Sequence, residues 1–269
     1  MVRESAANKI QMWLAASGVF CVVLYVIGWG IMGMCIPPWI PKASMSPQQF
    51  FDFYRDHSSR IMWGMTIASF AAGLFMAFSC QVSAQMWQRE KDGHVLALVQ
   101  LIGGVLTGWI GMVGPMMWLG LAEFSAQLDP ALVKFFHFLT WYTFDGTYWV
   151  TIAQFGAIGL MGLFDDDKTP LFPRWTGGVA GTVLAVSYTS LAFIPFDHTG
   201  AFSYDGLVNM YWVWITFFWY CIFVSVRCVK DLKRKNADAQ TLTRGQSHPE
   251  PAHRFDVALA ARGHSVEVD

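Results

Sequence analysis

Six long apolar stretches alternate with shorter polar segments along most of the chain. They cover residues 10–36, 61–87, 95–122, 141–164, 175–195 and 207–229. A hydrocarbon core about 30 Å thick needs roughly 20 helical residues to cross it, so each stretch is long enough to span a bilayer. The stretches are apolar on all sides and lack the alternation of a barrel strand. They predict an all-α fold, a polytopic transmembrane helical bundle with six spans.

Two short helices are predicted immediately before the second and fourth stretches. Ser46-Pro47 and Asp129-Pro130 each supply a capping side chain followed by a first-turn proline. Aromatic side chains follow in both segments, at 50–53 and 135–138. Helices that mix aromatic and charged side chains in this way lie along membrane surfaces. We therefore expect two short interfacial helices on the outer side of the membrane.

Lysine and arginine are unevenly divided between the two sides that six spans create. One side carries Arg3, Lys9, Arg89, Lys91, Lys168, Arg174, Arg227, Lys230, Lys233, Arg234 and Lys235, and the other carries Lys42, Arg55, Arg60 and Lys134. Basic residues are concentrated on the cytoplasmic side of membrane proteins. Both termini are therefore expected in the cytoplasm, with the chain in a bacterial inner membrane.

The last part of the chain is polar and contains Pro249 and Pro251 among scattered charges. It has too little apolar surface to offset the entropy of ordering. We expect residues 1–235 to form the transmembrane domain and residues 236–269 to form a disordered cytoplasmic tail.

Composition supports a membrane protein and limits its partners. Hydrophobic residues make up 54% of the 269 residues and charged residues only 14%, whereas soluble domains carry about 25% charged residues. The lipid bilayer is therefore the first expected partner. The outer segments are mildly acidic, which disfavours anionic substrates and provides no basic patch for a nucleic acid. Most cysteines fall within spans, so no disulfide framework is predicted.

The fourth stretch holds two polar residues of interest. Gln154 lies near its middle, where an amide usually bonds a neighbouring helix and where a substrate contact is the alternative. Asp145 is placed in the first turn of this span, near the outer interface, where the helix dipole stabilises a carboxylate. Alternatively, Asp145 pairs with Arg55 or Arg60, or binds a cation.

Other candidate ligands come from the outer segments. His137 precedes Asp145 by eight residues, so on a continuous helix the two side chains project about 80° apart and about 12 Å along the axis. They cannot touch directly. A site would require several outer segments to fold together, and solvated surface groups are the alternative. The candidate ligand-binding residues are His57, His137, Asp145, Gln154, Trp141 and Arg55, with Trp141 expected in an interfacial belt of tryptophans.

Familiar cofactor signatures are missing from the predicted spans. They contain no His-x-x-x-His or Cys-x-x-Cys pair, and no two histidines are placed to hold a haem between helices. Gly28-x-Gly30-x-x-Gly33 matches a dinucleotide-binding pattern, but it lies inside an apolar run and we interpret it as chance. We predict no cofactor and no metal site, and we assign no catalytic residue.

Glycine and methionine mark two further features. Gly104, Gly108, Gly111 and Gly114 form a stripe of small residues in the third stretch. The stripe indicates close helix packing within one subunit, with an oligomer seam or a hinge as the alternative.

Methionine and aromatic residues are concentrated in the outer halves of the spans. This composition suits an apolar ligand cavity and equally suits packing against lipid.

Two short patterns resemble a family of uncharacterised bacterial multi-pass inner-membrane proteins. They are Pro173-Arg174-Trp175-x-Gly177 at the start of the fifth span, and Gly200-Ala201-Phe202 with Gly206 before the sixth. The resemblance covers most of the membrane part and does not extend to the tail. That family carries no assigned activity, so the resemblance implies no function and no site residue.

The leading functional hypothesis is a non-enzymatic membrane protein that binds or passes a small lipophilic compound, apolar or aromatic. It acts alone, as a homo-oligomer, or as an accessory subunit beside a membrane protein partner. One alternative is a membrane enzyme with an outer-facing acid-base or metal site that contains His137 and Asp145, with His57 as a further candidate. The other is a purely structural or assembly subunit that uses its glycine-rich helix faces.

Overall fold

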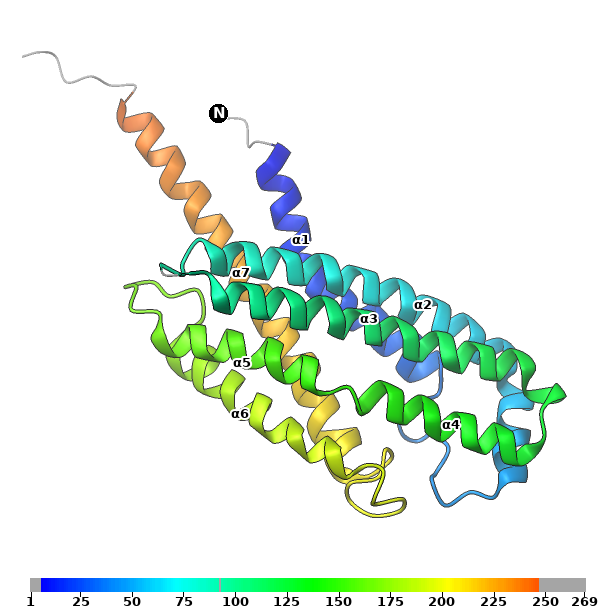
Figure 1. The fold of residues 1–269 in the computed structure, drawn as a ribbon. Coiled ribbons are helices and arrows are strands. Elements are labelled where there is room, and N and C mark those ends of the chain that lie inside the picture. Colours follow the sequence, from blue (N-terminus) through cyan, green and yellow to red (C-terminus); the bar gives the residue numbers. More distant parts are fainter. Residues whose placement is uncertain (1–5, 92, 247–269) are drawn as a thin grey trace, which may run out of the picture.

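The computed structural model describes residues 6–91 and 93–246, with side chains up to residue 241. Within that part of the chain the regular elements are all helices (Figure 1). Six segments are long and apolar enough to cross a membrane: Ala6–Met32, Pro47–Trp87, Val95–Gln127, Pro130–Phe164, Arg174–Phe193 and Leu207–Thr241. The predicted all-α bundle with six spans is therefore confirmed, and the protein is an integral membrane protein.

The spans consist of α-helices and of shorter helical segments with a different pitch, which are labelled η. In chain order they are α1 (Ala6–Tyr25), η1 (Val26–Met32), α2 (Pro47–Trp87), α3 (Val95–Phe124), η2 (Ser125–Gln127), α4 (Pro130–Asp145), α5 (Trp149–Phe164), η3 (Arg174–Val179), α6 (Ala180–Ser187), η4 (Tyr188–Phe193), η5 (Leu207–Val213) and α7 (Trp214–Gln246).

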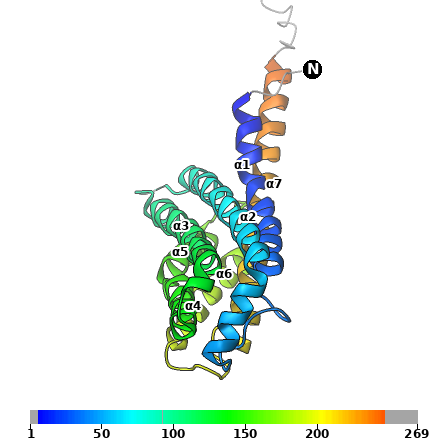
Figure 2. The ribbon, with the colours of Figure 1, turned by 90° about the vertical axis from the view of Figure 1, so that its right-hand side faces the viewer.

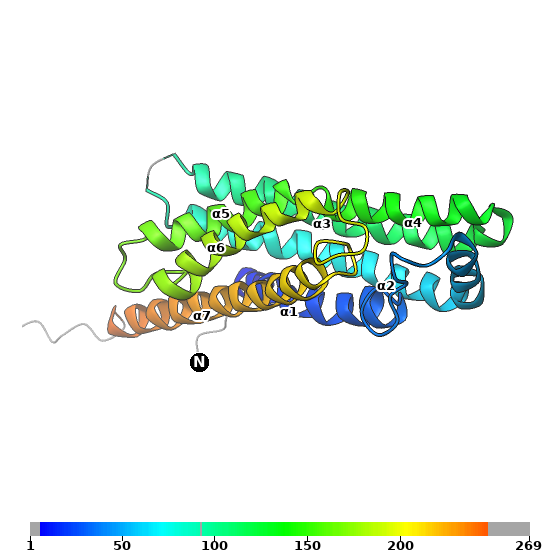
Figure 3. The ribbon, with the colours of Figure 1, turned by 90° about the horizontal axis from the view of Figure 1, so that it is seen from below.

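The helices run roughly along one common direction, with α1 beginning and α7 ending at the same end of the bundle (Figures 1 and 3). We call this end, which also holds the connections 88–94 and 165–173, the terminal end. The opposite end, with the connections 33–46 and 194–206, is the far end. α1 and α7 lie side by side and extend beyond the other helices at the terminal end (Figure 2).

The helix that begins at Pro47 is longer than expected. Ser46 caps it as predicted: its hydroxyl accepts a hydrogen bond from the Gln49 N–H at 3.3 Å, and its own N–H donates to Gln49 Oε1 at 2.8 Å. Because no proline or glycine follows until Gly64, the helix continues without interruption to Trp87. The first predicted interfacial helix is thus the beginning of the second span. The second, α4, does begin at the predicted cap on Asp129.

The last helix also continues past the boundary expected at residue 235. α7 extends to Gln246. Residues 247–269, the remainder of the predicted tail, lie outside the described residues.

The glycine stripe of α3 packs inside the bundle. A Cβ atom on Gly104 would lie 2.5 Å from Ser79 Oγ in α2, and one on Gly114 would lie 2.5 Å from a ring carbon of Phe144 in α4. Gly108 would bring a Cβ 2.6 Å from the Met76 side chain. The prediction that these glycines allow close packing within one subunit is confirmed.

A network of ion pairs holds the terminal end together. The carboxylate of Asp231 in α7 lies 2.6 Å from Arg89, 2.6 Å from Arg234 and 3.0 Å from Lys235. Arg89 follows α2 and also pairs with Asp167 at 2.7 Å. Arg89 therefore connects the end of α2 to Asp231 in α7 and to Asp167 in the 165–173 connection.

Candidate functional site

The fourth span is interrupted near its middle. α4 ends at Asp145 and α5 begins at Trp149, so Gly146–Tyr148 separates two half-helices. The Gly146 N–H donates to Tyr142 O at 2.9 Å and the Tyr148 N–H donates to Asp145 O at 3.2 Å, which satisfies part of the exposed backbone. Discontinuous transmembrane helices of this kind often form binding sites for substrates and ions.

This break corrects the expected position of Asp145. The carboxylate stands at the C-terminal end of α4 and not in the first turn of a helix. A helix C-terminus carries partial negative charge, so the dipole of α4 opposes a carboxylate there. The side chain is only 5% exposed. Stabilisation by a helix N-terminus, which was the structural explanation predicted for this residue, is therefore wrong.

Asp145 has a neutral hydrogen-bond partner from the far end of the bundle. Asn209 in η5 donates from Nδ2 to Asp145 Oδ2 at 2.8 Å and to Tyr204 O at 3.2 Å. Asn209 is fully buried, and its Oδ1 has no hydrogen-bond partner among the described residues. Sequence reasoning missed this residue, although it is an uncharged amide inside a predicted span, which is a recognised signal for interhelical hydrogen bonding.

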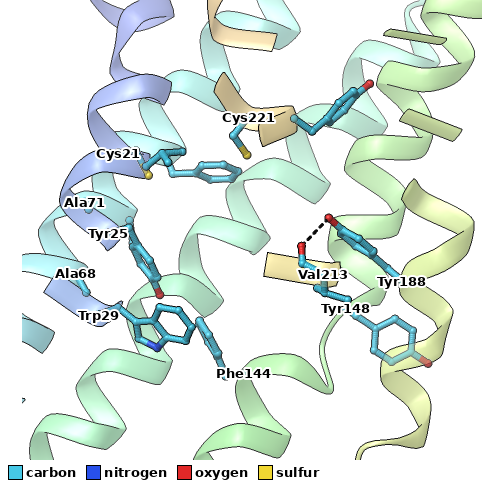
Figure 4. Packing of buried hydrophobic residues seen from close by; sticks show 14 of the residues in the cluster. Cys21, Tyr25, Trp29, Ala68, Ala71, Phe144, Tyr148, Tyr188, Val213 and Cys221 are labelled. Carbon is cyan, nitrogen blue, oxygen red and sulfur yellow. Dashed lines mark hydrogen bonds between the residues drawn. The ribbon is translucent and has the colours of Figure 1, made fainter. Parts of the chain in front are cut away.

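A cavity of about 80 Å³ adjoins the break, and residues of all six spans line it. Its aromatic lining consists of Tyr25, Phe75, Phe144, Tyr148, Tyr188, Trp214, Phe217 and Phe218. Asp145 is the one charged side chain in the lining. Tyr25 and Phe144 lie on one side and Tyr148 and Tyr188 on the other (Figure 4).

Two tyrosines in the lining donate their hydroxyl hydrogen bonds to backbone carbonyls. Tyr25 Oη donates to Gly111 O at 2.9 Å, and Tyr188 Oη donates to Val213 O at 3.2 Å, as drawn in Figure 4. These tyrosines therefore present mainly their rings to the cavity. By contrast, the Nε1 atom of Trp214 is buried and has no hydrogen-bond partner among the described residues.

A groove of about 260 Å³ adjoins the cavity, between η1 and η5. Trp214 and Phe218 line both spaces, and Trp214 lies 4.5 Å from Trp29 between ring centroids. In η1 the Gly33 N–H donates to the carbonyl five residues back, Gly28 O, at 2.7 Å. Such wide helical turns are frequent at functional sites. The remaining lining of the groove is mostly apolar and includes Val26, Ile36 and Ile215.

The buried face of α4 places three of the predicted ligands in one stripe. His137, Trp141 and Asp145 follow one another at intervals of four residues and are 2%, 0% and 5% exposed. The alternative of solvated surface groups is therefore wrong for His137 and Asp145, and Trp141 is not part of an interfacial belt. Trp141 stacks on Tyr204 with ring centroids 4.9 Å apart. The three residues are buried because α2, α3 and the 194–206 connection enclose α4.

The other three predicted ligands lie elsewhere. Arg55 is exposed and pairs with Asp52 at 3.0 Å and Asp56 at 2.9 Å. Arg60 donates to Ile31 O at 2.9 Å, so the hypothesis that Asp145 pairs with Arg55 or Arg60 is wrong.

His57 packs its ring edge against Phe53, outside the cavity. Gln154 is buried where α5 meets Gly104 of α3, and it does not line the cavity either. The structure also shows no group of three or more His, Cys, Asp or Glu side chains placed to hold a metal ion within residues 6–91 and 93–246.

The 194–206 connection forms the cover of this region at the far end. Asp197 accepts hydrogen bonds from the Phe202 N–H at 2.9 Å and the Gly200 N–H at 2.7 Å, and these bonds lower the pKa of its carboxyl. Tyr204 Oη donates to Pro41 O at 2.7 Å, which joins the two far-end connections. Burial raises the pKa of the Tyr204 phenol well above its usual value, so this hydroxyl remains a donor at neutral pH.

Tyr54→Phe is expected to lower the free energy of unfolding by about 1 to 3 kcal/mol, because it removes the partner of a buried imidazole. In the folded protein Tyr54 Oη lies 2.6 Å from His137 Nδ1, and both side chains are about 2% exposed. The measurement is thermal unfolding in detergent, followed by tryptophan fluorescence. Tyr211→Phe, at a ring that is 46% exposed, is the control and should leave the transition unchanged. Equal transitions for both variants would contradict a structural role for this hydrogen bond.

No protein-family model matches the chain, and no curated protein or solved structure is significantly similar to it.

Proposed function

We propose that this integral membrane protein binds a small apolar or aromatic compound in the cavity beside the α4–α5 break. The observation that carries the proposal is an aromatic cavity lined by residues of all six spans, at the point where one span is interrupted. Ligand sites in proteins are concave, mostly apolar and provided with a few polar groups, and this lining has that composition. The unpaired Nε1 of Trp214 supports a ligand that carries a hydrogen-bond acceptor.

The volumes support a ligand that occupies both spaces. An apolar cavity of about 150 Å³ holds benzene, so the 80 Å³ cavity takes only a smaller group. The groove adds about 260 Å³ on the other side of Trp214 and Phe218. A compound bound across these two side chains would place a small group in the cavity and an apolar body in the groove. A rotation of the Trp214 and Phe218 side chains would connect the spaces.

Gly111→Leu is expected to abolish binding of a small apolar ligand, because it fills the cavity. A Cβ at Gly111, which lines the cavity, would lie 3.6 Å from Ala72 and 3.8 Å from Tyr25 Oη, so the Cβ itself fits without a clash and the larger side chain is expected to enter the cavity. The matched control is Gly120→Leu in the same helix, where a Cβ meets nothing within 4 Å. The measurement is saturable binding of tritiated toluene to purified protein, with the methyl group of toluene in the cavity and its ring in the groove. Undiminished binding to Gly111→Leu would contradict the proposal.

We also propose that the terminal end faces the cytoplasm and that the membrane is a bacterial inner membrane. The basic residues Arg89, Lys168 and Arg227 all belong to the terminal end, and cytoplasmic segments of membrane proteins are enriched in such residues. A reporter enzyme that is active only in the cytoplasm should be active when fused after residue 241. The same reporter should be inactive when inserted after Thr199. The reverse pattern would contradict this orientation.

A further inference from the structure

Three sources of negative potential meet at the break in the fourth span. The first is the Asp145 carboxylate, which lines the cavity. The second is the C-terminal end of α4, where Asp145 is the last residue and the backbone dipoles sum to a partial negative charge, offset in part by the N-terminal end of α5 at Trp149. The third is the set of aromatic rings in the lining, because the face of a π-system is electron-rich. In transporters with discontinuous helices, the C-terminal end of a half-helix is a recognised place for a cation.

Nothing in the described part of the chain neutralises this carboxylate. The ion pairs of the described residues lie either near Arg55 or at the terminal end around Asp231, and none of them includes Asp145. Asn209 supplies one neutral hydrogen bond. Burying an ionised carboxylate without an opposite charge is costly, and a cationic ligand would offset that cost.

The walls of the cavity suit an organic cation. Phe144 and Trp214 stack with ring centroids 5.3 Å apart, and Tyr25 and Tyr148 line the same cavity as Asp145. A cation over the face of an aromatic ring is attracted by its electron-rich π-system, most strongly over tryptophan. A metal ion would instead require several oxygen or nitrogen ligands, whereas Asp145 is the one carboxylate here and the hydroxyls of Tyr25 and Tyr188 are bound to carbonyls.

We propose that the bound compound is an amphiphilic amine whose cationic nitrogen pairs with Asp145 in the cavity, while its apolar body lies in the groove beside Val26 and Ile215. This inference rests on the proposed function and specifies the class of ligand. The small cavity accommodates a primary or methylated ammonium group, and the larger groove accommodates an alkyl chain or a ring.

The test compares two compounds of equal length that differ in charge. Hexylamine, which is protonated at neutral pH, and 1-hexanol are each titrated against tritiated toluene bound to the full-length protein in detergent. Hexylamine is expected to compete at least about tenfold better than hexanol, because only the ammonium group pairs with Asp145 and the aromatic rings. Equal competition by both compounds would overturn the inference and leave the proposed function intact. Absence of toluene binding would instead overturn the proposed function.

Two variants test whether the preference for hexylamine over hexanol arises in the cavity. Asp145→Asn is expected to remove the advantage of hexylamine over hexanol, while Asp52→Asn, at an exposed carboxylate, should retain the advantage. If Asp145→Asn does not fold, Trp214→Leu provides the second test. It removes one aromatic face and should reduce the hexylamine advantage several-fold. An undiminished advantage in either folded variant would overturn the inference.

Discussion

Replacement of Asp231 by alanine is expected to lower the free energy of unfolding by about 3 to 5 kcal/mol, because it leaves a buried arginine without its main partner. The Asp231 side chain is 4% exposed and the Arg89 side chain 9% exposed. Arg234 and Lys235 bind the same carboxylate, so three basic groups would remain close together without it. The measurement is thermal unfolding of the detergent-solubilised protein, with the fraction of monodisperse protein after heating as a second observable.

The matched control for Asp231→Ala removes the other carboxylate that binds Arg89. Asp167 lies 2.7 Å from Arg89, but its side chain is 45% exposed. Water therefore screens this pair, and Asp167→Ala should cost about 1 kcal/mol or less. Similar losses of unfolding free energy in both variants would show that burial does not strengthen the ion pairs of Asp231.

Gly64→Ala is expected to destabilise the bundle by about 3 kcal/mol or more, because two backbones would have to separate. Added at this position, a Cβ would lie 2.5 Å from both Gly28 O and Gly33 N, and neither backbone atom can rotate away as a flexible side chain would. The contact joins α2 to η1 beside Trp29, so the groove should also lose its shape. Both unfolding temperature and toluene binding should therefore fall.

Gly73→Ala in the same helix is the control for Gly64→Ala. A Cβ there meets nothing within 4 Å, and alanine favours a helix more than glycine does. This variant should be as stable as the unchanged protein or slightly more stable. If Gly64→Ala behaved in the same way, the close approach of α2 and η1 would be contradicted.

The break in the fourth span had a signal in the sequence that the prediction of the spans did not use. Asp145-Gly146 is a dipeptide that marks turns, and it stands where the fourth span is interrupted. The predicted span started at residue 141, and this start placed Asp145 in a first turn. The helix in fact begins at the Asp129 cap, so the same carboxylate lies at a C-terminal end. One misplaced boundary reversed the expected effect of the helix dipole.

The hydrogen-bond partners of Asp145 and His137 come from distant parts of the chain, and no local sequence pattern indicates such a pairing. Asn209 meets Asp145 across 64 positions of the chain, and Tyr54 meets His137 across 83. Arg55, His57 and Gln154 have the residue types of a site, yet their faces of the helices point to solvent, to another ring or to a neighbouring helix. Residue type indicates what a side chain can bind and leaves open which cavity it enters.

The sequence by itself determined the number of spans, the all-α class and the caps at Ser46 and Asp129. These features depend on length, apolarity and neighbouring residues, because a bilayer requires each spanning segment to satisfy its own backbone. The tertiary structure decided that α4 and α5 are separate half-helices, that His137, Trp141 and Asp145 are buried, and that Asp145 lines an aromatic cavity without an ion-pair partner among the described residues. Those features depend on which faces of distant helices meet, and that packing is set by the whole bundle at once.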